Sequence, residues 1–111
     1  MSNIQEKDIN INIALRAKEA IEDRVKEGNF AEFKNLAMKM PVFISQNGLL
    51  LTSLYLQSSE GGKVYLDLLK KISKIDNFEE STTKDLEKSL FTAIWLFRYA
   101  KINTLKEADK K

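Results

Sequence analysis

The 111-residue sequence contains neither cysteine nor histidine. Without cysteine the chain forms no disulfide, so nothing in it indicates an oxidising compartment. The two absences exclude zinc sites built from thiolate or imidazole, and every catalytic dyad or triad whose base is histidine. The first eight residues, Met1 to Asp8, lack the apolar core of a secretory signal and carry acids, which transit peptides avoid. We therefore expect a cytoplasmic protein that uses no metal and no cofactor.

Residues that break helices are also scarce, because the chain has 1 proline and 4 glycines. This scarcity favours helix over a turn-rich all-β fold. The hydrophobic share of 43% is enough for a core, and the charged share of 31% is enough for a hydrated surface. A chain of 111 residues is too short for two independent cores. We expect one all-α domain over residues 1–111, a bundle of about five helices, folded over about 9–103 with frayed ends.

The most apolar stretch lies in the middle of the chain. Between Val42 and Leu56, nine residues are apolar and none is charged. The run is too long for an ordinary strand and shorter than the ~20 residues of a membrane span. Pro41 suits a first helical turn, so we predict a central helix over about 41–57 that its neighbours shield on nearly every side. Gly48 costs this helix ~1 kcal/mol relative to alanine, which predicts a close approach of another element there.

Apolar residues that recur at helical spacing predict four more helices. Asp8 is a candidate N-cap for the first, and Gly28 begins a suitable stop. Pro41 disfavours helical geometry in the residue before it, so we expect it to end the second helix. Thr82 or Thr83 is a candidate cap for the last. The four helices are predicted over about 9–27, 30–40, 63–75 and 84–103.

Acidic residues do not form a convincing catalytic group. Glu79 and Glu80 are adjacent on a predicted loop, where a solvated acidic patch is expected. Glu19 and Glu22 stand at helical spacing, but carboxylate metal helices normally add histidine, and basic residues within a turn favour salt bridges. Glycines 61 and 62 lack the spacing and the preceding strand of a phosphate-binding loop. We expect no catalytic activity.

Cations are most concentrated at residues 61–76, where four lysines stand against two aspartates. Lys70, Lys71 and Lys74 fall on one broad helix face, which is either an ordinary solvated face or a surface for phosphates. No alternation of basic and aromatic residues typical of base stacking is evident. The sequence thus predicts at most a surface that follows a phosphate backbone without sequence preference. Further cations on other predicted helices are Arg16, Lys18, Lys34, Lys39, Arg98 and Lys101.

Asn47 and Gly48 interrupt the apolar run and leave two interpretations open. The first is a buried Asn47 whose amide meets a backbone carbonyl, with the glycine permitting close helix crossing. The second is a helix surface that docks a partner protein or a nucleic-acid backbone.

Four motifs, in this order and spacing, resemble the small α-helical subunit of CRISPR Cmr complexes, the fifth Cmr protein. The similarity spans about 14–101. The motifs are Arg16-Ala-Lys-x-Ala20, Phe33-Lys-x-Leu-Ala37 running into Lys39-x-Pro41, Ile44-x-x-Asn-Gly-Leu49, and Ala93-Ile-Trp-Leu-Phe-Arg-Tyr-Ala100.

The resemblance implies a non-catalytic helical bundle within a type III-B RNA-guided effector complex of antiviral defence. It implies that copies stack as a minor filament beside the backbone subunits and help to hold the guide–target duplex. The implied partners are other Cmr subunits, further copies of the chain, CRISPR RNA and target RNA, with no membrane.

Carried over by position, Arg16, Lys18 and Lys39 match basic positions of the family, Asn47 and Gly48 match its Asn-Gly, and Arg98 matches a basic residue near its end. Together, the residues and the resemblance predict two sets. The RNA or subunit contacts are Arg16, Lys18, Lys34, Lys39, Lys70, Lys71, Lys74 and Arg98, and the structural motif is Pro41, Asn47 and Gly48. The alternative from the residues alone is a helical adaptor that docks a protein through an apolar groove around Leu49 to Leu56, with no nucleic-acid role.

Overall fold

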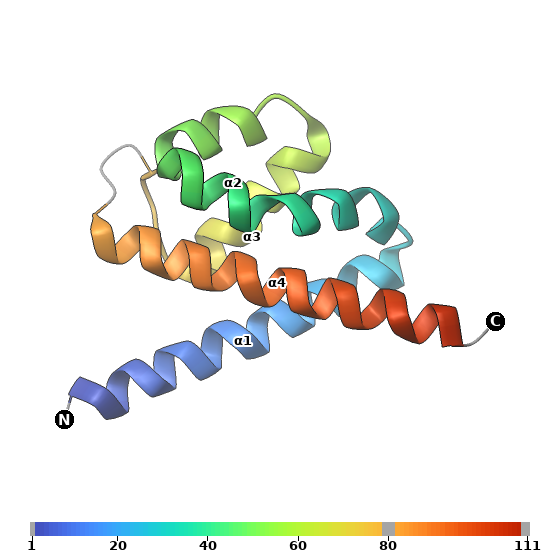
Figure 1. Ribbon diagram of the computed structural model, residues 1–111, viewed down its shortest axis with the longest axis horizontal. Helices are drawn as coiled ribbons and strands as arrows, with labels where there is room; N and C mark the ends of the chain where they lie inside the picture. The colour runs from blue at the N-terminus through green and yellow to red at the C-terminus, as the bar shows by residue number, and fades with distance from the viewer. Residues whose placement is uncertain (1, 79–81, 110–111) are drawn as a thin grey trace.

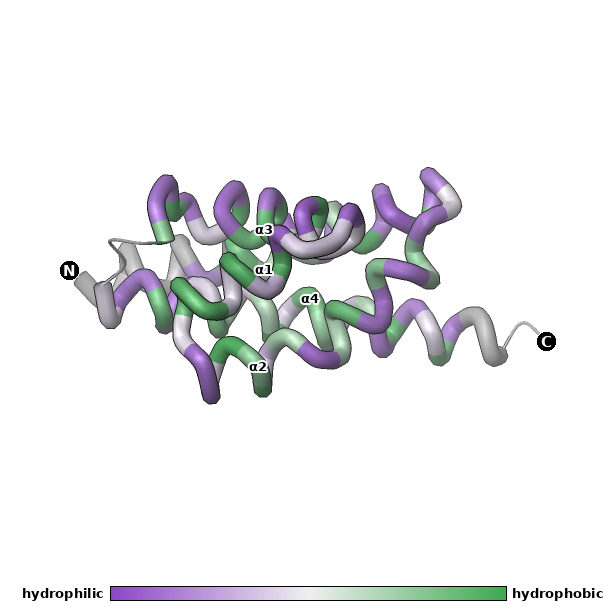
Figure 2. The backbone as a smooth tube through the Cα atoms, turned by 90° about the horizontal axis from the view of Figure 1, so that it is seen from above, coloured by the Kyte–Doolittle hydropathy of each residue, from purple (hydrophilic) through white to green (hydrophobic). Residues whose placement is uncertain are grey.

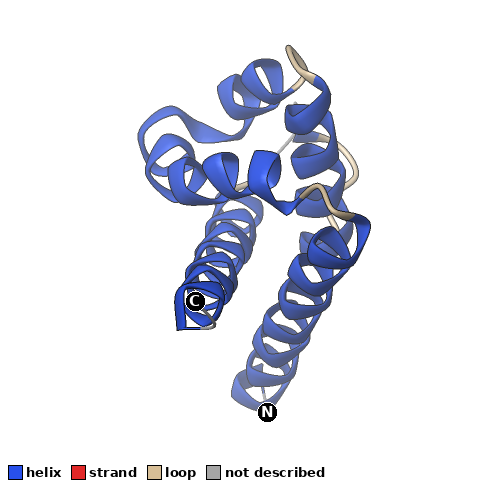
Figure 3. Cartoon of the chain, turned by 90° about the vertical axis from the view of Figure 1, so that its right-hand side faces the viewer, coloured by secondary structure: helices blue, strands red, loops and turns tan. Residues whose placement is uncertain are grey.

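The computed structural model describes the backbone of residues 2–78 and 82–109 and the side chains of residues 10–78 and 82–106. Within these residues the chain forms helices and loops and no strand (Figure 3). The helices are α1 (Ser2–Glu27), α2 (Phe30–Leu56), α3 (Glu60–Ser73) and α4 (Thr83–Asp109). The all-α prediction is confirmed, with four helices in place of about five.

Helix α4 runs through the middle of the molecule, and each of the other three helices packs against it (Figure 1). Alanines lie at several of these contacts, and Ala17, Ala37, Ala93 and Ala100 are fully buried. Small side chains let helix axes approach closely, which suits a chain with so few residues to form a core. Larger buried residues fill the space between the axes. They include Ile13, Phe33, Met40, Ile44, Leu56, Tyr65, Leu69 and Leu96.

Tyr65 is a core residue and not part of a polar site. Its ring lies 5.4 Å from that of Phe33, centroid to centroid, and it has no exposed surface. Burial raises the pKa of the Tyr65 hydroxyl well above its usual range, because the phenolate would lose its hydration. The hydroxyl finds no hydrogen-bond partner among the described residues. The phenol therefore stays neutral and contributes packing.

Two of the four predicted helix-end signals, at Gly28 and Thr82, are confirmed. Gly28 has a φ of 78°, and the chain turns there between α1 and α2. The Thr82 hydroxyl accepts a hydrogen bond from the Asp85 amide at 3.2 Å, and the Asp85 carboxylate accepts one from the Thr82 amide at 3.0 Å. This reciprocal pair begins α4. Asp8 is not an N-cap, because α1 already begins at Ser2, and α4 likewise continues beyond the predicted end to Asp109.

The predicted helix break at Pro41 is wrong. Pro41 lies inside α2, which continues through it. Ala37, Met40 and Ile44 are all fully buried. At spacings of three and four residues they form one stripe only if the helix is continuous. Burying a methionine and an isoleucine contributes about 1.5–3 kcal/mol each. This gain offsets the helix-breaking cost of an internal proline, about 3 kcal/mol.

The backbone of α2 instead changes direction at Gly48. This residue has φ 79° and ψ 177°, a conformation open essentially to glycine alone. A Cβ atom added to Gly48 would meet no atom within 4 Å, so the predicted close approach at this residue is wrong. The close approach occurs at Gly62, where an added Cβ would collide with the carbonyl oxygen of Leu56. Gly48 is therefore required for its backbone conformation and not for space.

The prediction that neighbours shield this helix on nearly every side is also wrong. Leu49 and Leu56 face the core, but Val42 is 60% exposed and Leu54 is 57% exposed. Figure 2 shows the hydrophobic colour around the α2 label, on the outer side of the molecule. We call this surface the apolar α2 patch. It consists of Val42, Leu50, Leu51, Leu54 and Tyr55.

The patch is exposed because none of the four helices in the described part of the chain covers it. Thr52 and Ser53 take buried positions in the same segment. The Thr52 hydroxyl donates to the carbonyl oxygen of Gly48 at 2.6 Å, and the Ser53 hydroxyl accepts from the Gln57 amide at 2.9 Å. Satisfied locally in this way, the two hydroxyls carry little desolvation cost. Side-chain polarity alone therefore does not decide which side of α2 faces inward.

We predict that Gly48→Ala destabilises the protein by about 1–3 kcal/mol, because alanine is strained at this φ and ψ. Gly61→Ala is the matched control. Gly61 lies in α3, and its added Cβ would make only an ordinary contact, 3.8 Å from Leu36 Cδ1. We expect this control to be neutral or stabilising by up to about 1 kcal/mol. Urea unfolding followed by circular dichroism measures the free energy of unfolding of both variants. Equal values for Gly48→Ala and Gly61→Ala would contradict the role given to Gly48.

Candidate nucleic-acid interface

Arg16 and Lys74, two of the predicted contact residues, come together where α1, α3 and α4 meet. They line a pocket of about 160 Å³ together with Lys88, a residue of α4 that the sequence did not single out. No acidic residue lines this pocket. Its lining residues are Asn12, Ile13, Arg16, Ile72, Ser73, Lys74 and Lys88. We call this site the basic pocket.

A second and larger pocket, of about 420 Å³, adjoins the basic pocket and shares Arg16 with it. This pocket lies between α1 and α3 and contains Lys71. Glu19 and Asp23 also line it, so its two cations are balanced by two carboxylates. Anions are therefore favoured in the basic pocket over the larger one.

Buried hydroxyls hold the end of α3 against α4 beside the basic pocket. The Ser73 and Thr92 hydroxyl oxygens are 2.7 Å apart, and both residues are buried. The Thr92 hydroxyl donates to the carbonyl oxygen of Lys88 at 2.8 Å. Because that bond uses the one hydroxyl proton of Thr92, Ser73 is the donor to Thr92. This pairing places Lys74, the next residue after Ser73, beside the same pocket as Lys88.

Lys74 has an unusual backbone conformation for a lysine. With φ 58° and ψ 47° it is the single non-glycine residue at positive φ among those described. It ends α3, and the amide of Ile75 donates to the carbonyl oxygen of Lys70 at 3.0 Å. Glycine is strongly favoured at such a position, and the left-handed conformation costs other residues about 1–2 kcal/mol. Part of that cost is offset by the attraction between a cation and a helix C-terminus.

The remaining predicted cations lie apart from the basic pocket. Lys70 is partly buried, with its Nζ atom 5.8 Å from the ring centre of Phe78, so it does not share the open face predicted for it with Lys71 and Lys74. Lys34 is also partly buried. Lys18 is exposed and lies 4.0 Å from the Glu22 carboxylate, whereas Glu19 forms no ion pair among the described residues, so the salt-bridge interpretation of α1 holds only for Glu22.

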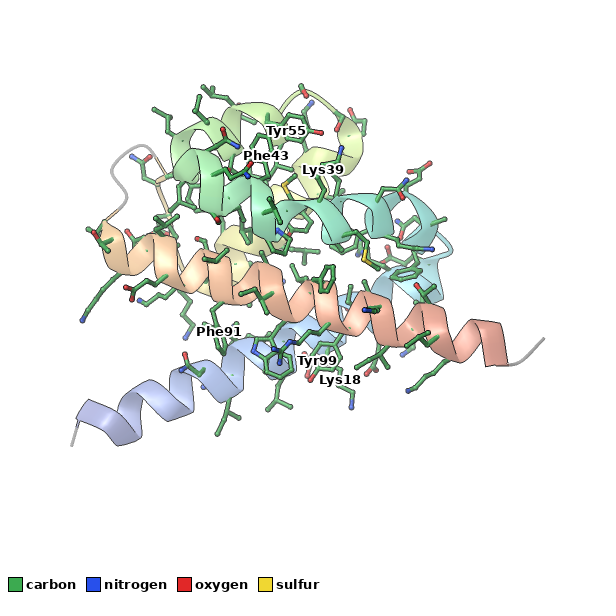
Figure 4. The ribbon with its side chains drawn as sticks, viewed as in Figure 1. Lys18, Lys39, Phe43, Tyr55, Phe91 and Tyr99 are labelled. Atoms are coloured by element: carbon green, nitrogen blue, oxygen red, sulfur yellow. The ribbon has the colours of Figure 1, made fainter. Side chains whose placement is uncertain are left out.

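Lys39 belongs to the edge of the apolar α2 patch. Its ammonium donates to the Tyr55 hydroxyl at 3.2 Å and lies 5.7 Å from the centre of that ring. Tyr55 in turn stacks on Phe43 at 4.7 Å between centroids (Figure 4). Asn47 is exposed, and its amide donates to the carbonyl oxygen of Phe43 at 2.9 Å. The carbonyl partner of the first interpretation is thus present, but Asn47 is not buried as that interpretation requires.

Arg98 stacks on an aromatic ring, contrary to the expectation that basic and aromatic residues are not combined. Its guanidinium carbon lies 5.1 Å from the ring centre of Trp95. Trp95 also contacts Phe91 at 6.2 Å and Tyr99 at 5.5 Å, centroid to centroid. The regular spacing of these three aromatic residues, with Arg98 beside the last, was a signal visible in the sequence.

Carboxylates contribute little to a candidate site. Among the described residues no group of three or more acidic side chains could hold a metal ion. Glu79 and Glu80 lie outside the described residues. Within the part of the chain that the structure describes, no helix is long and apolar enough to cross a membrane.

An all-helical chain with cations at a three-helix junction and a separate apolar patch has the features of a small subunit that contacts other macromolecules. The family model of the CRISPR-associated protein Cas_Cmr5 matches residues 9–101. The chain belongs to this family, and it is therefore a subunit of a CRISPR-associated Cmr complex that contains other subunits. Comparisons with curated protein sequences and with solved structures found no match.

We predict that Lys74→Gly stabilises the fold by up to about 1 kcal/mol, because glycine adopts the left-handed conformation without strain. The same change should weaken the binding of a linear polyphosphate, since it removes one of three cations from the basic pocket. Thermal unfolding and a salt-controlled binding titration measure the two effects. Lys71→Gly is the control, because glycine inside α3 should destabilise by about 1 kcal/mol. Loss of stability in Lys74→Gly would contradict the strain assigned to this residue.

Proposed function

We propose that the chain is a non-catalytic structural subunit of a type III-B CRISPR RNA-guided effector in antiviral defence. Copies stack as a minor filament along the guide–target duplex, and each contacts the RNA backbone through its basic pocket. The observation that supports the RNA contact is the grouping of Arg16, Lys74 and Lys88 around one opening without an acidic residue. None of the three forms an ion pair among the described residues.

Like charges gathered in this way repel one another, and a phosphate group relieves the repulsion. Binding to RNA is driven further by release of the counterions condensed on its backbone. Three cations give one copy only modest affinity at physiological salt, which agrees with the formal net charge of +2. Copies held in a row would add their contacts, because each later contact becomes intramolecular. The proposed arrangement thus converts a weak monomer into an effective support for the duplex.

We predict that the combined change Arg16→Glu, Lys74→Glu and Lys88→Glu greatly reduces target-RNA retention by the assembled complex, while the fold is preserved. The same charge change at three exposed lysines outside the pocket, Lys26, Lys101 and Lys106, is the control. Filter binding at increasing salt measures retention. We expect the slope of log affinity against log salt to become shallower by about 2–3 for the pocket variant. Equal retention by both variants would contradict the assignment of this pocket.

The apolar α2 patch favours a second kind of contact. Large exposed apolar surfaces on soluble proteins commonly mark protein–protein interfaces. The segment from Met40 to Ser59 contains no charge, and the nearest cation in the sequence, Lys39, is held against Tyr55. We propose that this patch docks a neighbouring subunit. The alternative function, a helical adaptor with no nucleic-acid role, is favoured by the patch and not by the basic pocket.

We predict that Leu51→Glu with Leu54→Glu prevents co-purification with the other Cmr subunits, because charges would have to be buried at the interface. Both leucines are exposed, so the isolated chain should fold and bind polyphosphate normally. The control changes two exposed apolar residues of α4, Ile102→Glu with Leu105→Glu, and should still co-purify. Normal assembly of the Leu51/Leu54 variant would contradict the assignment of the apolar α2 patch to a subunit interface.

A further inference from the structure

The aromatic row of α4 stands on the same helix face as a cation of the basic pocket. Lys88, Phe91, Trp95 and Tyr99 follow one another at spacings of three, four and four residues, which places them on one stripe of the helix. Lys88 and Trp95 are about 10 Å apart along the axis, given the 1.5 Å rise per residue. A bound strand that leaves the basic pocket along α4 would therefore meet the aromatic row next.

The rings of this row are only partly buried. Phe91, Trp95 and Tyr99 each retain some exposed surface, and Figure 4 shows Phe91 and Tyr99 extending from α4 towards α1. Packing against the core accounts for the buried parts of these rings. It does not account for Arg98, which is exposed and has no ion pair among the described residues.

Arg98 adds a flat, charged surface to the row. Its guanidinium carbon lies 5.1 Å from the ring centre of Trp95, so the arginine covers part of that ring and carries a positive charge over it. Guanidinium planes and aromatic rings are the surfaces on which proteins stack unpaired RNA bases. A fully paired stretch of duplex, whose bases are already stacked on one another, offers no base to such a surface. An RNA strand with unpaired bases supplies both the phosphates and the rings.

We propose that Arg98, Trp95 and Tyr99 form a stacking platform for an unpaired base of an RNA strand whose phosphates occupy the basic pocket. This inference rests on the proposed contact between RNA and the basic pocket. It adds that the neighbouring surface of α4 recognises the base, whereas the pocket recognises the phosphate. The platform reads no sequence, because every base presents a flat face. It distinguishes an RNA strand with an unpaired base from a fully paired duplex and from an anion without bases.

Trp95 is the only tryptophan of the chain, so its fluorescence reports on this platform alone. The full-length protein is titrated at low salt with oligouridylate and, separately, with linear polyphosphate of matched charge. We expect oligouridylate to quench the Trp95 emission and polyphosphate to bind without quenching. Arg98→Gln and, independently, Tyr99→Leu should weaken oligouridylate binding about tenfold, the loss of one stacked base, and leave polyphosphate binding nearly unchanged.

Lys101→Gln is the matched control, since it removes a cation from α4 about 120° around the helix from Trp95. It should change the binding of both ligands little and equally. Tyr99→Leu keeps an apolar side chain, so it tests the platform should Arg98→Gln fail to fold. Equal binding of both ligands without quenching of Trp95 would contradict the stacking platform but not the proposed phosphate contact of the basic pocket. Absence of binding by either ligand would overturn both.

Discussion

The structure depends on one buried face of α4, against which the other three helices pack. Ala93, Leu96 and Ala100 on this face are fully buried, and two of the three are alanines that let neighbouring axes come close. Beside this face the side chains of α4 are less deeply buried: Lys88 and Trp95 are partly buried and Arg98 is exposed. The packing of the core therefore determines where these three side chains lie.

Helix α2 shows the consequence of building a core from so few elements. The helix continues through Pro41, so that Ala37, Met40 and Ile44 form one buried stripe. Gly48 then redirects the chain, and Leu49 and Leu56 also face inward. A small chain buries a smaller fraction of its surface than a large one does, and no helix among residues 2–78 and 82–109 covers the outer side of α2. The exposed patch that results is the surface to which we assign the contact with a neighbouring subunit.

The basic pocket and the apolar α2 patch share no residue, so the RNA contact and the protein contact that we propose can be tested separately. Lys74 illustrates how the two demands of folding and binding conflict at one position. Its left-handed backbone would be better served by glycine, yet its side chain completes the group of cations with Arg16 and Lys88. Residues that carry local strain without benefit to packing are commonly found where a protein binds something.

Local chemistry in the sequence was sufficient to predict the all-helical class, the turn at Gly28 and the cap at Thr82, because these depend on residues within about one turn. The order and spacing of the four sequence motifs were sufficient to identify the family. The tertiary structure alone decided that Pro41 stays inside a helix, that Leu50, Leu51 and Leu54 of α2 face water, and that Lys88 joins Arg16 and Lys74. These outcomes depend on which segments distant in sequence come into contact and on how many helices cover each side of α2 and α4. The spacing of residues along the chain does not determine either.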